Sequence, residues 1–159
     1  MATIEIRDAT EEDATQILTF IRELASYEKA EHEVVAEEHD IRESIFGQNS
    51  TVSALICSID KVPIGFAVYF YNYSTWQGKN GLYLEDLYVS PEYRGFGAGK
   101  ELLKHLARLA ISQGCGRFEW SVLDWNKPAI EFYESIGAKQ KKEWIGYQLT
   151  GTALHELSK

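Results

Sequence analysis

The sequence predicts a single domain built on a mixed sheet of strands covered by helices, and three observations support this. Short runs rich in β-branched and aromatic residues alternate with stretches whose apolar residues recur at helical spacing. A glycine-rich loop at 94–100 separates one such strand from one such helix. The 159 residues are 45% hydrophobic and contain no repeat or low-complexity tract. A chain of this length can bury one core, so we expect one domain over 1–159.

The first half of the chain is expected to contribute strands at both ends and two helices between them. Thr10, followed three residues later by Asp13, suits the start of a helix because both side chains can bond the free backbone N–H groups. Gly47 suits the end of the second helix. In order, the expected elements are a strand at 3–7, a helix at about 10–25, a helix at 40–46 and hairpin strands at 52–59 and 64–73.

The second half alternates strands with helices. Pro91 ends an apolar run because proline has no N–H for a sheet ladder, and Gly114 and Gly137 suit helix ends. Pro128 suits the first turn of a helix. The expected elements are a strand at 82–89, a helix at about 100–113, a strand at 118–123, a helix at 128–136 and a strand at 144–149.

Composition excludes several classes of function. The formal net charge is −8, whereas general nucleic-acid binding needs a basic surface, so we expect no nucleic-acid partner. No segment is long and apolar enough to span a membrane, and no signal peptide is visible, so we expect no membrane partner. Cys57 and Cys115 lack metal-ligand spacing, and the four histidines are scattered, so no metal is expected. Free thiols fit a cytoplasmic protein.

The loop at 94–100 has the features of an anion site. It joins a strand to a helix, where glycines let a ligand approach the backbone and the first helical N–H groups have no partner within the helix. With the helix dipole, and with Arg94 and Lys100 nearby, such a turn suits a pyrophosphate. Walker A spacing is absent, and the glycines at 95, 97 and 99 do not match the Rossmann pattern. A turn without a ligand remains an alternative.

In this setting, residues 94–99 (RGFGAG) resemble the pyrophosphate signature of the GNAT superfamily of N-acetyltransferases, Arg/Gln-x-x-Gly-x-Gly/Ala. The order of expected elements is also that of a GNAT domain. The resemblance implies an α+β fold with a mixed, mostly antiparallel sheet of about seven strands flanked by helices. It further implies acetyl-CoA as co-substrate and a homodimer. It also implies that the strand ending at Val89 separates from the strand that begins at Phe118, and that this separation admits the cofactor arm. The implied cofactor-binding residues are Leu87, Tyr88, Val89, Arg94, Gly95, Phe96, Gly97, Ala98, Gly99 and Lys100.

The segment from Asn126 to Ala138 also resembles the family, because it is similar to the family pattern N-x-x-A-x-x-x-Y-x-x-x-G-A/F. The resemblance implies that the hydroxyl of Tyr133 faces the sulfur of CoA and acts as the general acid. It also places Asn126, Lys127, Pro128 and Ala129 at the cofactor. The alternative is that Tyr133 only packs beside Phe132.

The reaction also needs a base. An amine with a pKa of about 10.4 is neutral in only about one molecule in a thousand at pH 7. Supplying the neutral form costs roughly 4–5 kcal/mol unless a base removes the proton. Glu85 and Asp86 end an apolar run, where a carboxylate needs a role or a partner. We predict Glu85 to be the base, acting directly or through water, while strand alternation would point Asp86 to the other face.

Four further segments resemble the diamine acetyltransferase branch: 73–76 (YSTW), 83–86 (YLED), 91–95 (PEYRG) and 122–126 (VLDWN). Ser74 and Glu119 stand where spermidine/spermine enzymes tend to carry an acid and a histidine, so the chain looks more like the thialysine acetyltransferase subgroup. The amine pocket implied by the resemblance and by residue chemistry consists of Tyr27, Glu28, Trp76, Glu85, Asp86, Glu119, Trp120 and Ser121.

The preferred hypothesis is therefore an N-acetyltransferase that moves acetyl from acetyl-CoA to a small cationic amine, directly and in a ternary complex. No cysteine or serine stands where a covalent carrier would be required. A spermidine/spermine acetyltransferase is the first alternative. A GNAT-like module that senses acyl-CoA without turnover is the second, and it has no use for the acid and base predicted above.

Overall fold

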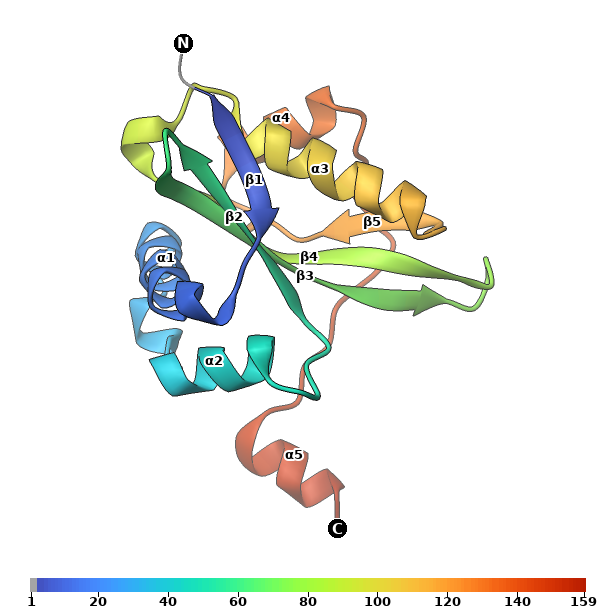
Figure 1. Ribbon diagram of the computed structural model, residues 1–159. Coiled ribbons are helices and arrows are strands. Elements are labelled where there is room, and N and C mark those ends of the chain that lie inside the picture. Colours follow the sequence, from blue (N-terminus) through green and yellow to red (C-terminus); the bar gives the residue numbers. More distant parts are fainter. Residues whose placement is uncertain (1–2) are drawn as a thin grey trace. The chain divides into compact units, whose positions relative to one another are not determined.

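Five strands form one sheet in the order β1-β2-β3-β4-β5 among residues 3–159, which the computed structural model describes (Figure 1). The strands are β1 (Ile4–Asp8), β2 (Ser53–Ile59), β3 (Val62–Ser74), β4 (Lys79–Val89) and β5 (Arg117–Trp120). β1 to β4 are antiparallel neighbours, and β5 joins β4 in parallel. The predicted mixed, mostly antiparallel sheet is confirmed, but the described residues form five strands rather than about seven.

The pairing of β4 changes at Glu85. In β3 the successive residues Val68 and Tyr69 pair with Asp86 and Leu84, so Glu85 is an extra residue, a β-bulge. Cross-strand partners share a face and successive residues alternate, so Leu84 and Asp86 point to opposite faces although they are two positions apart. Regular alternation along β4 is therefore broken between Leu84 and Asp86, and the opposite orientation of Glu85 and Asp86 stays a prediction.

The parallel ladder between β4 and β5 is short. It runs from Gly81 opposite Arg117 to Leu84 opposite Trp120 and stops there, while β4 continues to Val89 paired with β3 alone. The separation of these strands expected from the family resemblance therefore begins at Glu85. From this residue onward, no strand among residues 3–159 pairs with β4 on the β5 side.

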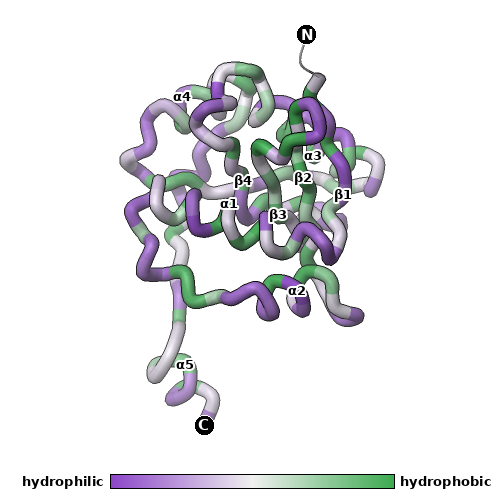
Figure 2. The backbone as a smooth tube through the Cα atoms, turned by 60° about the vertical axis from the view of Figure 1, so that its left-hand side comes forward, coloured by the Kyte–Doolittle hydropathy of each residue, from purple (hydrophilic) through white to green (hydrophobic). Residues whose placement is uncertain are grey.

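Helices cover both faces of the sheet in the part of the chain up to Ser121, with α1 (Ala14–Tyr27) and α2 (Glu38–Phe46) on one face and α3 (Ala98–Ser112) on the other (Figure 1). Phe20 of α1 lies in the core between these helices and the sheet, stacked on Phe66 of β3 with ring centroids 5.6 Å apart. Leu102 and Leu106 belong to the apolar stripe of α3 and are buried. Figure 2 shows hydrophobic stretches gathered where the central strands pass through this unit.

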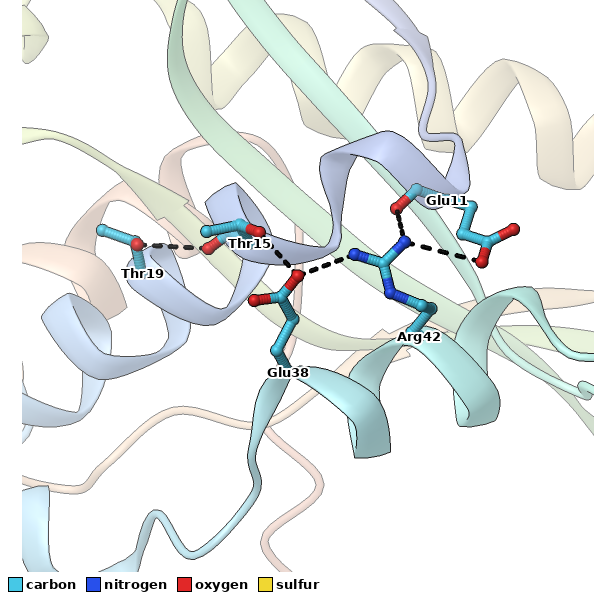
Figure 3. A network of polar contacts seen from close by, with 5 residues as sticks. All are labelled: Glu11, Thr15, Thr19, Glu38 and Arg42. Atoms are coloured by element: carbon cyan, nitrogen blue, oxygen red, sulfur yellow. Dashed lines mark hydrogen bonds and ion pairs between the residues drawn. The ribbon is translucent and has the colours of Figure 1, made fainter.

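A polar network joins α2 to the start of α1 (Figure 3). Arg42 donates to Glu38 Oε1 at 2.7 Å and to the Glu11 carbonyl at 3.2 Å, while the Thr15 hydroxyl donates to the same Glu38 oxygen at 2.8 Å. The hydrogen bond from Arg42 is the main cause that lowers the pKa of Glu38 below its ordinary value. The glutamate is thus held ionised and fully partnered.

The residues Val122–Lys159 form a second compact unit, which holds α4 (Lys127–Ser135) and α5 (Gly151–Leu157). α4 confirms the predicted helix, whereas the strand predicted at 144–149 is absent and this segment belongs to no helix or strand. α5 was not predicted from sequence because it is short and begins at Gly151, which has a φ of 55°. No helix among residues 3–159 has the length and apolar character needed to cross a membrane.

Candidate active site

The glycine-rich loop forms the turn that the sequence predicted. Gly95 and Gly97 have φ values of 92° and 84°, which are open to glycine and strained for other residues. Gly97 is the N-cap residue of α3, so the N–H groups of the first helical turn face out beside it. A hollow of about 490 Å³ adjoins this turn, and its lining includes Phe96, Lys100 and Arg108. Lys100 and Arg108 therefore bring positive charge beside the first turn of α3, and Glu101 also lines the hollow.

Arg94 connects this loop to the end of α1. Its Nε donates to the Val89 carbonyl at 3.0 Å. Its guanidinium carbon lies 5.0 Å from the ring centroid of Tyr27 and 5.8 Å from that of Tyr88, distances at which a cation is attracted to an aromatic face. This contact between a cofactor candidate and an amine-pocket candidate could not be predicted from the sequence, because 67 positions of chain separate Tyr27 from Arg94.

Three carboxylates, Glu28, Glu85 and Asp86, lie near one another, since the charges of the first two act on Asp86. Glu28 is the C-cap residue of α1, and its pKa is raised by burial. Burial, reinforced by the charges of Glu85 and Glu28, raises the pKa of Asp86 to about 6. Within residues 3–159, no ion pair neutralises any of the three side chains. Like charges held together without a cation form a site that a cationic ligand would stabilise.

The β-bulge at Glu85 explains why Asp86 lies near Glu28. Asp86 pairs with Val68, which belongs to the core on the α1 face, so Asp86 points toward the side where α1 ends at Glu28. Glu85, the extra residue, is exposed at the point where the ladder with β5 stops. Had the alternation continued unbroken, Asp86 would have shared a face with Leu84 instead.

Three further candidate residues, Glu119, Trp120 and Ser121, lie at the end of β5. Glu119 Oε1 lies 2.8 Å from Arg117 Nε, outside hydrogen-bond geometry, so this contact is an ion pair that offsets the charge of Glu119. The Trp120 ring packs against Phe118, with centroids 4.9 Å apart. Ser121 shares a hydrogen bond of 2.9 Å with the Tyr83 hydroxyl, which ties the end of β5 to β4 next to Glu85.

Trp76 lies elsewhere in the same unit. It is in the turn that joins β3 to β4, and its side chain is 89% exposed. The ladder between Ser74 and Val68 separates this turn from the bulge by six residues, or roughly 20 Å of strand. The structure therefore does not bring Trp76 to Glu85 within this unit.

The second unit holds the remaining candidates on or beside α4. Asn126 Oδ1 caps the helix by accepting from the Ala129 N–H at 3.4 Å, and Pro128 occupies the first turn. Tyr133 is half-buried, with its ring centroid 5.8 Å from that of Phe132. Its carbonyl accepts from Ala138 N at 3.1 Å, closing the helix end at a glycine. The helix geometry is as predicted, and the roles of these side chains stay predictions.

Comparison with known proteins decides the family. The model of the acetyltransferase (GNAT) family matches residues 14–138. The chain belongs to the GNAT family. It is 41% identical to a thialysine N-epsilon-acetyltransferase of Sus scrofa over 169 aligned residues that cover 99% of each chain. It is 46% identical to an L-ornithine N5-acetyltransferase of Arabidopsis thaliana over 100 residues, 63% of this chain and 44% of that one.

Among solved structures, an integron cassette protein from the mobile metagenome of V. cholerae aligns with a TM-score of 0.83 and 30% identity, covering 98% of both chains. The GNAT identity predicted from the glycine-rich loop is thereby confirmed, and the chain is an N-acetyltransferase. The N-terminal strand and α5 lie outside the residues that the family model matches, so the match covers the sheet from β2 to β5 and every candidate site residue.

Proposed function

We propose that this GNAT enzyme transfers the acetyl group of acetyl-CoA to the primary amine of a small cationic substrate, a thialysine-like amino acid or a short diamine. The observation that carries the proposal is the group of three carboxylates, Glu28, Glu85 and Asp86, where α1 ends and the ladder of β4 with β5 stops; no ion pair among residues 3–159 neutralises them. A bound ammonium would relieve their mutual repulsion. The relatives that act, by name, on thialysine and L-ornithine support the same class of substrate.

Acetyl-CoA is proposed to bind along the loop and the edge of β4 that faces β5. The pyrophosphate would accept hydrogen bonds from the N–H groups around Gly97 and Ala98, with Arg94 and Lys100 supplying charge. The pantetheine arm would pair with the backbone from Leu87 to Val89, as a strand pairs with a sheet edge. Asn126 and the first turn of α4 are proposed to contact the same cofactor. The left-handed glycines and the end of the ladder between β4 and β5 support this assignment.

The chemistry needs two protons removed from the substrate nitrogen and one supplied to the sulfur. Glu85, directly or through water, is proposed to take the first proton from the substrate ammonium. The neutral nitrogen attacks the thioester carbonyl carbon, the C–N bond forms, and the C–S bond then breaks. The departing thiolate takes a proton from the Tyr133 hydroxyl, and the second proton lost by the nitrogen restores that hydroxyl directly or through water, giving free CoA and an N-acetyl amide. Transfer is direct within a ternary complex.

Substrate choice is proposed to follow from where the negative charge lies. Glu28, Glu85 and Asp86 are close together, which suits one ammonium on a compact molecule. Glu119 is neutralised by Arg117 and adds little attraction. Ser74 supplies no carboxylate for a distant second charge, so spermidine should be a poorer substrate than thialysine. A surface charge pair is worth up to about 1 kcal/mol, so this preference is several-fold.

The deciding experiment measures release of free CoA thiol with thialysine, lysine, ornithine, putrescine, spermidine and a histone-tail peptide. The expected result is the highest kcat/KM for thialysine or ornithine. A clear preference for spermidine would establish the first alternative, a polyamine enzyme. Binding of acetyl-CoA without release of thiol for any amine would establish a sensing module.

The role of Tyr133 has its own test. Tyr133→Phe should lower kcat roughly ten- to a thousandfold because one general acid is lost, while far-UV circular dichroism stays unchanged. Phe132→Leu is the matched control, since it alters the neighbouring ring without touching the hydroxyl. Wild-type turnover in Tyr133→Phe would assign the tyrosine to packing.

The proposed enzyme is a cytoplasmic homodimer. The family resemblance supports the dimer, and two free cysteines, one of them buried, support a reducing compartment.

A further inference from the structure

Arg94 belongs to the glycine-rich loop by its backbone and to the amine side of the site by its side chain. Its backbone follows the single 3₁₀ turn at Pro91–Tyr93 and precedes the left-handed Gly95. Its side chain turns back toward β4, since Nε donates to the Val89 carbonyl at 3.0 Å. One residue therefore connects the loop proposed for the pyrophosphate with the region where α1 ends.

Two aromatic rings hold the guanidinium of Arg94. Its central carbon lies 5.0 Å from the ring centroid of Tyr27 and 5.8 Å from that of Tyr88. Tyr88 is a firm support, because it is buried and packs against Phe20 with ring centroids 5.9 Å apart. Both contacts attract a cation to an aromatic ring. They place a positive charge at the end of α1, directly beside the amine-pocket candidates Tyr27 and Glu28.

The terminal nitrogens of this guanidinium are available to an anion. Among residues 3–159, no ion pair joins Arg94 to a carboxylate, and neither Nη1 nor Nη2 makes a hydrogen bond. A guanidinium carries five N–H donors in a planar fork that matches phosphate oxygens. A pyrophosphate bound at the loop would therefore attract the side chain of Arg94 away from the rings.

Where it lies now, the guanidinium competes with the substrate ammonium for Tyr27. An ammonium on the face that Arg94 occupies is excluded by contact. An ammonium on the other face lies across a single ring from a like charge, and the two repel with modest strength because both are partly exposed to water. Amine binding is therefore weaker for as long as Arg94 stays on the ring of Tyr27.

We propose that Arg94 couples the two substrate sites: acetyl-CoA draws its guanidinium to the pyrophosphate, and the amine then binds more tightly. This inference rests on the proposed function and adds a regulation of the same site. The coupling is about three- to tenfold, because the charges involved are partly exposed. Coupling is reciprocal, so the amine tightens the binding of CoA by the same factor. The chain thereby favours the ternary complex over either binary one.

Titration calorimetry of thialysine, with and without saturating CoA, tests the coupling. CoA replaces acetyl-CoA in this experiment because it carries the same pyrophosphate and has no acetyl group to transfer. In the wild type, CoA should lower the Kd for thialysine about three- to tenfold. Arg94→Gln should bind thialysine more tightly than the wild type in the absence of CoA, and CoA should then change its Kd no further.

Lys100→Gln is the matched control, since it removes the other cation proposed for the pyrophosphate and leaves Arg94 and Tyr27 in place. It should bind CoA more weakly, yet show the full change in thialysine affinity once CoA is saturating. Tyr27→Leu is a second, independent variant. It removes the ring that holds the guanidinium, so the ratio of the two Kd values should fall to about one.

Three results would overturn the coupling. They are a wild-type Kd for thialysine that CoA leaves unchanged, full coupling in Arg94→Gln or Tyr27→Leu, and weaker thialysine binding by Arg94→Gln than by the wild type without CoA. Release of CoA thiol from acetyl-CoA separates this inference from the proposed function. A wild type that turns over thialysine without coupling refutes the inference alone, whereas a chain that binds and acetylates no amine refutes both.

Discussion

Two groups of acidic residues in the same unit are in opposite electrostatic situations. Glu38 of α2 accepts hydrogen bonds from Arg42 and Thr15, and its pKa lies below the ordinary value (Figure 3). Asp86 of β4 is surrounded by Glu85 and Glu28, and its pKa is raised to about 6 by burial and by their charges. Glu38 therefore has a positively charged partner within the chain, whereas no cation among the described residues pairs with Asp86.

The presence or absence of a positive partner distinguishes a structural carboxylate from a functional one more clearly than burial or residue type does. A partnered carboxylate lowers the free energy of the folded chain, and nothing further is required of it. An unpartnered, half-buried carboxylate such as Asp86 raises that free energy, and a cation bound near Asp86, Glu28 and Glu85 would lower it again.

Glu85→Gln should cause the largest change, a loss of kcat of roughly 10²- to 10³-fold with thialysine, because the amide cannot accept the ammonium proton. The loss should shrink as pH rises toward the pKa of the free amine, since less deprotonation is then required. A steady-state pH–rate profile of both proteins measures this. Turnover at the wild-type level at pH 7 would remove Glu85 from the reaction.

Asp86→Asn should stabilise the protein at pH 7 by roughly 2–3 kcal/mol, because each unit of pKa shift corresponds to about 1.4 kcal/mol. The native state holds the Asp86 proton up to about pH 6, whereas the unfolded chain loses it near pH 4. The contribution of Asp86 to stability is therefore greatest at low pH and falls as pH rises from 4 to 6.

Urea unfolding at pH 4 and pH 7 measures this effect. The variant should gain stability over the wild type at pH 7 and little at pH 4, while its KM for the amine rises. An equal gain at both pH values would contradict the raised pKa as the cause.

Glu28→Gln should raise KM for the amine several-fold and leave kcat nearly unchanged, because a partly exposed charge pair is worth about 1 kcal/mol or less. Added salt should raise KM in the wild type and do so less in the variant, since screening then has one charge fewer to act on. Initial-rate measurements at two ionic strengths test both expectations. A fall in kcat with unchanged KM would instead place Glu28 in the chemical step.

Glu38→Gln should have the smallest effect and the opposite sign, a slight decrease in Tm at pH 7 with no change in kcat or KM. Because the folded pKa is lowered, the contribution of Glu38 is present at neutral pH and is lost as pH falls through that pKa. Differential scanning calorimetry at pH 7 and pH 3 should therefore show the two proteins converging at the lower pH. A persistent difference there would point to lost packing.

Much of the fold and the loop could be predicted from the sequence because the relevant signals are local. Pro91 and the glycines at 95 and 97 act through their own backbone angles, and the apolar stripe of α3 acts through helical spacing. The contact of Arg94 with Tyr27 could not be predicted, because it depends on how α1 crosses the sheet.

The strand predicted at 144–149 shows a different limit. Its alternation is real, but a strand exists only when another backbone pairs with it, and the described residues supply none. The bulge at Glu85 was missed for a related reason. An extra residue leaves no mark in one strand read alone, since it is defined only by the partner strand, where Val68 and Tyr69 are adjacent.

The bulge makes Glu85 separable from the rest of its strand. Deleting Glu85 would restore regular pairing and leave Leu84 and Asp86 on the opposite faces where their partners Tyr69 and Val68 already place them. Leu82 would stay buried and Asp86 would stay on the α1 face, so the proposed base alone would be lost. When relatives of this protein are aligned, a gap at this position should therefore be treated as a change of enzyme rather than as a neutral deletion.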